Sequence, residues 1–153
     1  MKAVFLLNFA QFIDWPADAF PDAEAPFVIG ILGVDPFRRS LDDVVRNETV
    51  RNRKVVVRHF ARVEDLRLCH ILFIGTSEER LLPRILAELN RRPILTVSEI
   101  EGFVNDGGMI RFYMQDAKVR FRINNEAARA AHLTISSKLL RVAEVLTPNP
   151  PPE

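Results

Sequence analysis

The side chains with the most reactive chemistry in this sequence are one cysteine and three histidines. Cys69 cannot close an internal disulfide without a second cysteine, and His70 follows it directly. A nucleophilic thiolate needs an exposed, electropositive setting and a base within hydrogen-bonding reach. Adjacent residues of a strand point to opposite faces, which would separate this thiol from the imidazole. We therefore expect Cys69 to be a free thiol in the core, and we predict no catalytic residue.

The histidines show no pattern typical of a metal site. His59, His70 and His132 lack metal-ligand spacing and have no carboxylate partner one helical turn away. We therefore predict neither a metal site nor a cofactor. The pair His59 and His70 stays open, because the strands expected to carry them could be neighbours. A polar cleft that holds either ring beside a carboxylate would favour an enzyme.

Two short stretches resemble phosphate sites without the residues that such sites require. Gly30 and Gly33 precede Asp35, but the G-x-G-x-x-G order and the Lys-Ser/Thr pair of a phosphate loop are missing. A close turn between a strand and a helix explains these glycines better. The apolar residues 71–74 lead into Gly75, with no aspartate to accept a phosphoryl group.

Positive side chains gather on one face of an expected hairpin, beside a tyrosine. A solvated surface explains this face better than an anion site, because the chain as a whole is nearly neutral. The residues of this face are Arg111, Tyr113, Lys118, Arg120 and Arg122.

Two other segments are candidates for binding a ligand or a partner. The first places a tryptophan beside a carboxylate at the end of the first expected helix, where the indole could equally well only close the core. The second is the expected start of the last helix, whose N–H groups could hold a carboxylate or a phosphate. The candidate residues are Asp14, Trp15, Pro16, Thr134, Ser136 and Ser137.

The composition predicts one globular domain. The chain has 153 residues, of which 48% are hydrophobic and 27% are charged, and its formal net charge is +1. A chain of this length can bury one sizeable core. The near-neutral charge gives no electrostatic reason to expect nucleic acid as a partner. No apolar run reaches the roughly 18 to 20 residues that a membrane span needs.

Short apolar runs alternate with amphipathic segments, which predicts a three-layer αβα domain with a mixed, mostly parallel sheet and an antiparallel C-terminal hairpin. The run at residues 69–75 is continuously apolar and leads into a helix, so we expect it at the centre of the sheet. The other expected strands are residues 27–33, 54–60, 93–97, 109–114 and 118–124. The expected helices cover residues 4–13, 78–91, 98–103, 125–132 and 138–145. A further helix is expected to begin at Asp35-Pro36.

The N-terminal segment has two interpretations. Its apolar start followed by Ala17-Asp18-Ala19 imitates a signal peptide with its cleavage site. However, Asn8, Gln11 and Asp14 interrupt the apolar run, which favours a largely buried helix with a narrow polar stripe.

We place the domain at residues 1–146. Residues 147–153 are rich in proline and are expected to form a tail or the beginning of a linker.

Six blocks of the sequence, in order, resemble the YfiR family, which is also known as DUF4154. They include the first-helix block that ends in Asp14-Trp15-Pro16 and the Cys69-His70-Ile71 block. The resemblance covers nearly the whole chain. The six blocks are residues 2–16, 69–74, 95–98, 107–110, 119–124 and 135–140.

This resemblance implies a non-enzymatic periplasmic signalling regulator. It implies that the chain represses a membrane diguanylate cyclase by binding its periplasmic part, which lowers cyclic di-GMP and biofilm formation. It also implies a homodimer, room for a small-molecule ligand, and an export signal that would precede Lys2. The two candidate binding segments, around Trp15 and Ser136, are expected to approach each other in the family's arrangement.

A second function fits the same resemblance, because related domains are the ligand-sensing parts of membrane histidine kinases. The Pro-rich tail would then lead to a membrane helix, and the full-length gene would decide between the two functions.

The resemblance also implies that a disulfide is missing. In family members that have it, the cysteine of the Cys-His-Ile block pairs with a cysteine in the first sheet strand, at the position of Gly30 in this chain. Loss of such a bridge costs a few kcal/mol. The core or a dimer would have to compensate for it.

Overall fold

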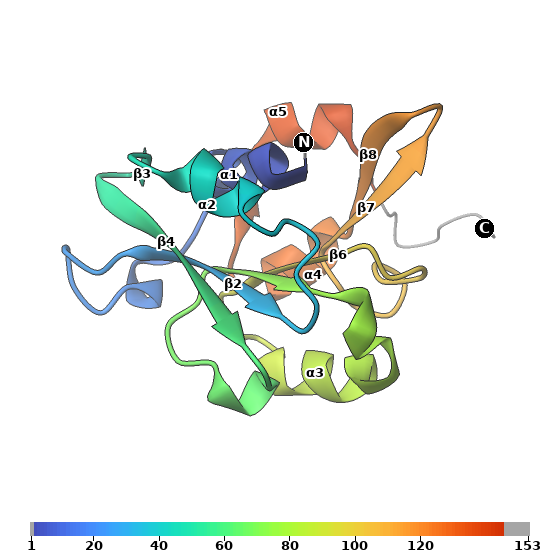
Figure 1. Cartoon of the computed structure of the whole chain (residues 1–153), viewed down its shortest axis with the longest axis horizontal. Helices are drawn as coiled ribbons and strands as arrows, with labels where there is room; N and C mark the ends of the chain where they lie inside the picture. Colours follow the sequence, from blue (N-terminus) through green and yellow to red (C-terminus); the bar gives the residue numbers. More distant parts are fainter. Residues whose placement is uncertain (1, 146–153) are drawn as a thin grey trace.

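A computed structural model describes residues 2–145 as a twisted sheet with helices on both faces (Figure 1). Within these residues the strand order is β10-β8-β7-β6-β5-β2-β4-β3. The strands are β2 (Phe27–Leu32), β3 (Thr49–Val50), β4 (Arg53–Phe60), β5 (Ile71–Ile74), β6 (Leu95–Ser98), β7 (Ile110–Gln115), β8 (Lys118–Ile123) and β10 (Glu144–Val145). The α-helices are α1 (Lys2–Phe12), α2 (Ser40–Val45), α3 (Leu82–Leu89), α4 (Asn125–Ala130) and α5 (Ser137–Val142).

The centre of the sheet is built from the continuously apolar runs. β5 lies between β2 and β6, and all three are parallel. Every residue of these strands is buried, because helices cover both sides. The predicted central position of the run at residues 69–75 is confirmed.

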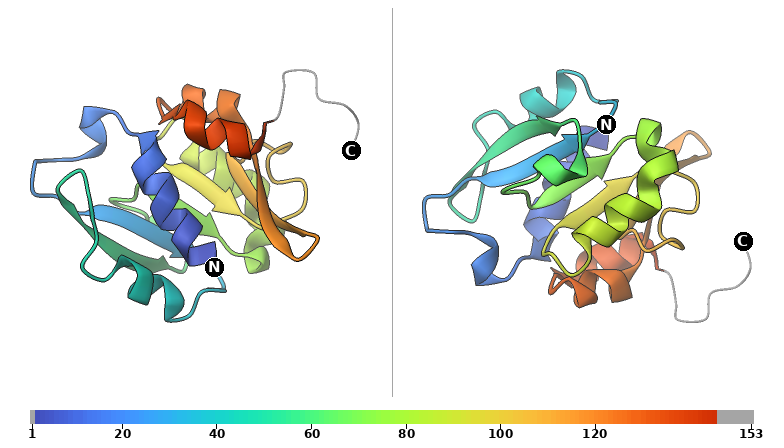
Figure 2. Two further views of the ribbon diagram at one scale, coloured as in Figure 1. Left: turned by 90° about the horizontal axis from the view of Figure 1, so that it is seen from above. Right: turned by 90° about the horizontal axis from the view of Figure 1, so that it is seen from below.

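Helices cover both faces of the sheet (Figure 2), and each face carries its own cluster of buried apolar residues. Residues of α1, α2, α4 and α5 pack with one face, where Phe9 and Phe73 are almost completely buried. Residues of α3 pack with the other face, in a cluster that contains Leu32 and Ile85. This arrangement confirms the predicted αβα architecture.

The C-terminal hairpin has the predicted register. Ile110 lies opposite Ile123, and Phe112 lies opposite Phe121, which are buried pairs on the core side. Met114 continues the same alternation along β7, but 56% of it is exposed. It lies opposite Val119 near the hairpin tip, which extends beyond the core.

The N-terminal segment is a core helix, as its helical interpretation predicted. Leu6 and Phe9 of α1 are fully buried. Burial is less complete than expected, because Val4 and Phe12 are 45% and 40% exposed on its outer side.

Several helix boundaries were predicted incorrectly. The helix expected at residues 98–103 is a series of turns, because Ser98 completes β6 and Gly102 has a left-handed φ of 79°. The helix expected from Asp35 begins only at Ser40, since the Asp35 carboxylate accepts the N–H groups of Phe37 and Arg38 in a turn.

Two further helices differ from their predicted ranges. The residues before α3 form a 3-10 helix, Thr76–Leu81, and Pro83 occupies the first turn of the α-helix. The last helix, predicted to reach residue 145, ends at Val142, because the chain then joins the sheet as β10 beside β8. The Pro-rich tail at residues 147–153 lies outside the described residues.

Replacing Phe9 by alanine should lower the free energy of unfolding by about 3–5 kcal/mol, because a fully buried aromatic ring leaves a cavity. Urea denaturation measures this change. Val142→Ala is the control, since Val142 is 71% exposed and its loss should cost no more than about 0.5 kcal/mol. Equal stabilities of the two variants would mean that α1 is not part of the core.

Candidate functional site

The two candidate binding segments pair directly. β1 (Ile13–Asp14) and β9 (Thr134–Ile135) form a small antiparallel sheet in which Asp14 lies opposite Thr134. The N–H of Ser136 donates to the carbonyl of Phe12, which extends the contact. The predicted approach of the two segments is confirmed. We call the exposed side of this pairing, with Asp14, Thr134 and Ser137, the β1–β9 ridge.

Arg51 completes this ridge, although it was not among the residues predicted from the sequence. Its guanidinium forms an ion pair with Asp14 and donates to the carbonyl of Ile13 at 3.2 Å. Arg51 and Asn52 form the turn between β3 and β4, with left-handed φ values of 52° and 67°. An asparagine between two short β-prone runs is a hairpin signal that could have placed this turn.

The remaining candidate residues have structural contacts. The hydroxyl of Ser136 accepts the N–H of Lys138 at 3.2 Å and thereby caps α5. Trp15 and Pro16 are half-buried. The indole of Trp15 packs edge-on against Phe27 with ring centroids 4.9 Å apart. Roles for these residues in binding remain predictions.

His70 connects Trp15 to the centre of the fold. The indole N–H of Trp15 donates to the carbonyl of His70 at 3.0 Å, and the N–H of Leu95 donates to the same oxygen at 2.8 Å. The N–H of His70 donates to the carbonyl of Val28 at 2.9 Å. The backbone of this residue therefore joins the end of α1 to three parallel strands.

Both nitrogens of the His70 ring are also used. Nδ1 accepts the N–H of Val28 at 3.0 Å, so the proton lies on Nε2, which donates to the carbonyl of Ala19 at 3.0 Å. The ring stacks on Phe20 and Phe27 with centroids 4.2 Å and 5.0 Å away. This arrangement requires a neutral imidazole, since a proton on Nδ1 would face the N–H of Val28.

The charges around His70 favour the same neutral state. Burial, together with the nearby Arg53 guanidinium, lowers the pKa of His70 to about 4, although the hydrogen bond to Ala19 opposes this shift. The Arg53 guanidinium lies 3.8 Å from the centre of the Phe20 ring. His70 is therefore a structural residue, which the sequence could not distinguish from a ligand.

Cys69 precedes His70 just before β5, and the two side chains lie on opposite sides of the sheet. Its thiol is free and buried, as predicted, and it packs with the α3 layer. Burial raises the pKa of Cys69 to about 12, so the thiolate needed for nucleophilic attack is absent at neutral pH. A Cβ atom placed on Gly30 would lie 2.9 Å from the Cys69 sulfur. This distance fits a disulfide, in which each sulfur lies about 3 Å from the partner's Cβ.

His59 and His70 do not share a site. β2 separates β4, which carries His59, from β5. His59 Nε2 instead lies 2.9 Å from the Asp35 carboxylate, and 56% of its side chain is exposed. This contact places a carboxylate beside a histidine, but on an open surface rather than in a cleft. Among residues 2–145, no three His, Cys, Asp or Glu side chains are placed to hold a metal ion.

The chain itself fills the crevice at the carboxyl ends of the central strands, where α/β proteins often bind ligands. The N–H of Val34 donates to the Ser77 hydroxyl at 3.0 Å. A Cβ atom on Gly75 would lie 2.4 Å from the carbonyl of Val34. The two loops therefore touch, and Gly33, with a φ of 83°, makes a close turn as predicted.

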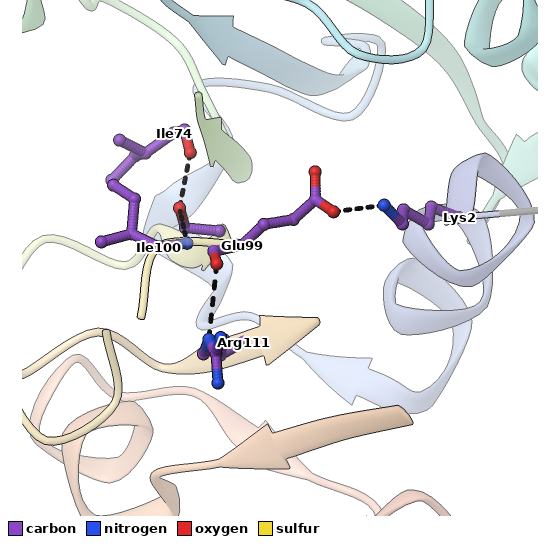
Figure 3. Close-up of polar contacts among 6 residues, drawn as sticks. Lys2, Ile74, Glu99, Ile100 and Arg111 are labelled. Atoms are coloured by element: carbon purple, nitrogen blue, oxygen red, sulfur yellow. Dashed lines mark hydrogen bonds and ion pairs between the residues drawn. The ribbon is translucent and has the colours of Figure 1, made fainter. Parts of the chain in front are cut away.

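Polar groups at the carboxyl ends of β5 and β6 also form hydrogen bonds with one another (Figure 3). The Ser98 hydroxyl donates to the carbonyl of Ile74 at 2.6 Å and accepts the N–H of Ile100 at 3.1 Å. Glu99 forms an ion pair with Lys2 of α1, and its carbonyl accepts the guanidinium of Arg111 at 3.4 Å. The ion pair connects the start of α1 to the residue that follows β6.

The positive hairpin face is organised around its tyrosine. The guanidinium groups of Arg111 and Arg122 lie 5.8 Å and 5.1 Å from the centre of the Tyr113 ring. These cation–π contacts hold the two guanidinium groups against the tyrosine ring of the same hairpin.

An apolar groove lies between α1, the hairpin and α5. Two cavities of about 760 Å³ and 430 Å³ adjoin at Phe5 and Val119, which line both, and the larger one is also lined by Pro36, Phe37 and Ser40. We call this surface the α1–hairpin groove. Its further lining residues include Lys2, Phe9, Phe12, Met114, Lys118, Phe121, Lys138 and Val142.

Comparison with known proteins identifies a family. A family model described as DUF4154, YfiR/HmsC-like, matches residues 1–144. No curated protein matches the chain. Among residues 2–145, no helix has both the length and the apolar character needed to cross a membrane.

Replacing Gly30 by cysteine should create a disulfide with Cys69, because the new Cβ would lie 2.9 Å from the Cys69 sulfur, close to the distance between these atoms across a disulfide. The disulfide would close the loop between residues 30 and 69. Under oxidising conditions it should therefore raise the free energy of unfolding by about 3–4 kcal/mol. Thiol titration and urea denaturation, with and without reductant, measure both effects.

Gly30→Ser is the matched control for the disulfide. It meets the same crowding from Phe60, whose ring atom lies 2.9 Å from the added Cβ, but it cannot form the bond. Two free thiols in the oxidised Gly30→Cys variant would contradict the geometry.

The neutral His70 ring should make folding sensitive to acid. The unfolded state takes up the proton near pH 6.5, whereas the folded state does so only near pH 4. The free energy of unfolding should therefore fall by about 3 kcal/mol from pH 7 to pH 4 on account of this residue. Urea denaturation across this pH range measures the slope.

Substitutions separate His70 from the other groups that titrate in this range. His70→Gln should remove its share of the pH dependence, whereas His59→Gln, at an exposed histidine, should retain that share. Equal slopes for the two variants would refute the assignment.

Proposed function

The chain belongs to the YfiR/HmsC-like family (DUF4154), and from this membership we propose that it represses a membrane-bound diguanylate cyclase. The family consists of periplasmic regulators of a non-catalytic kind. Repression would operate by binding the periplasmic part of the cyclase, which lowers cyclic di-GMP output and biofilm formation. The match over residues 1–144 is the observation that carries this proposal.

The state of the reactive side chains supports a binding function. His70 is held neutral by hydrogen bonds to Val28 and Ala19, and the Cys69 thiol is buried beside Gly30. Both residues stabilise the fold in these positions. A partner would therefore contact other residues, at the surface of the molecule.

The β1–β9 ridge is one such surface. Asp14, Thr134 and Ser137 are exposed on two segments that hydrogen bonds hold in register. We assign partner or small-molecule contacts to this ridge and to the adjoining Trp15-Pro16 and Ser136. Pre-ordered backbone favours binding, because little conformational entropy is lost.

The proposed setting is the periplasm, and the proposed assembly is a homodimer. A soluble repressor that binds an exported domain of a membrane enzyme must meet it in that compartment. Fractionation of cells that express the full gene tests the location, and analytical ultracentrifugation tests the dimer.

Capture by the periplasmic portions of the organism's diguanylate cyclases tests the proposal directly. The unaltered protein should retain at least one of them and should lower cyclic di-GMP in cells that contain it. Thr134→Lys should weaken capture by about tenfold or more, since it places a long charged side chain on the ridge. Glu88→Lys on α3, which lies on the other face of the sheet, is the control and should bind normally.

Failure to capture any cyclase would contradict the repressor function. Capture that Thr134→Lys leaves unchanged would instead exclude the ridge as the contact surface.

A further inference from the structure

We propose that the α1–hairpin groove binds an acidic amphipathic helix of a partner protein. This inference rests on the proposed regulatory function and specifies the chemistry of the partner segment. It concerns a different surface from the β1–β9 ridge.

The groove has the dimensions of a short helix. Its wall follows α1 from Lys2 to Phe12, a length of about 15 Å at 1.5 Å per residue. About three turns of a bound helix would fit along it. The opposite wall is formed by Val119 of the hairpin and by Val142 of α5.

Apolar side chains both line and rim the groove. Phe5 and Phe9 pack edge-on against Phe121, with centroids 5.8 Å and 5.4 Å away, which gives a rigid aromatic floor. At the rim, Met114 and Val142 are 56% and 71% exposed. Exposed apolar side chains gathered at one concave surface are typical of a protein-binding site.

The charged residues in the groove are all of one sign. Lys2, Lys118 and Lys138 line it, and no described lining residue is acidic. Lys2 already has a partner in Glu99, so Lys118 and Lys138 determine the charge preference of the rim. The chain as a whole has a net charge of only +1, which makes this a local asymmetry. Carboxylates beside an apolar stripe would complement it.

Charge and shape together favour a partner helix over other occupants. In a symmetric dimer built on this groove, the lysines of one copy would lie near those of the other. Such like charges are unfavourable at an interface. Helix-in-groove recognition instead places apolar residues at i, i+3, i+4 and i+7 into the groove and charged residues at its rim.

Fluorescence anisotropy with designed peptides tests the proposal. The probe is a fluorescein-labelled amphipathic helix of about four turns, with leucines on one face and glutamates beside them. It should bind saturably, and more weakly as salt is raised. A peptide with lysine in place of each glutamate should bind at least about tenfold more weakly. A scrambled acidic peptide should not bind.

Substitutions at exposed positions locate the binding surface with little risk to folding. Val142→Asp should abolish binding of the acidic peptide, whereas Leu81→Asp should leave it unchanged, since Leu81 is 50% exposed before α3, away from the groove. The double variant Lys118→Glu, Lys138→Glu should prefer the lysine peptide. This reversal of preference cannot arise from general destabilisation.

Several results would overturn the inference. These are the absence of saturable binding, equal binding of the two charge versions, and binding that Val142→Asp does not change. Conversion of a dimer to a monomer by Val142→Asp would identify a second copy as the occupant. Binding that becomes about tenfold tighter when residues 147–153 are removed would identify the Pro-rich tail instead.

The peptide assay is independent of the proposed function. Peptide binding without cyclase capture would retain the groove and reject the repressor function. Cyclase capture that is unaffected by Val142→Asp would retain the repressor function and reject the groove.

Discussion

The neutral imidazole of His70 connects parts of the chain that are far apart in the sequence. Its ring holds Val28 of β2 and the loop at Ala19, and its backbone holds Trp15 and Leu95. Stacked aromatic rings exclude water from these bonds, which strengthens them. The position of the β1–β9 ridge depends on this network, because Trp15 follows β1 directly.

The sequence pattern predicted those strands whose burial shows in their own run of apolar residues. The runs at β2, β5 and β6 are continuously apolar because both faces are covered, and the alternation around Phe112 and Phe121 fixes the register of the hairpin. Two-residue strands such as β1 and β9 leave no such pattern, since each forms only beside a distant partner. The helix expected at residues 98–103 was predicted wrongly because the hydroxyl partners of Ser98 depend on the tertiary fold.

The candidate site was partly predictable for the same reason. The meeting of the segments around Trp15 and Ser136 followed from the family resemblance, but the contribution of Arg51 required the turn that brings it to Asp14. The α1–hairpin groove was not predicted, because nothing in the sequence indicated that Met114 and Phe12 lie at the surface. Their exposure appears only where the hairpin tip and α1 extend beyond the sheet. A family of non-catalytic regulators is consistent with a fold in which Cys69 and His70 are buried.

The central claim is that His70 is a neutral structural residue, and NMR titration of its imidazole tests this most directly. Long-range nitrogen–proton correlations should show the tautomer with the proton on Nε2 at pH 7, because Nδ1 accepts the N–H of Val28. The ring should stay neutral until the pH approaches 4. A protonation midpoint near 6.5, or a proton on Nδ1 at pH 7, would contradict this account of the fold.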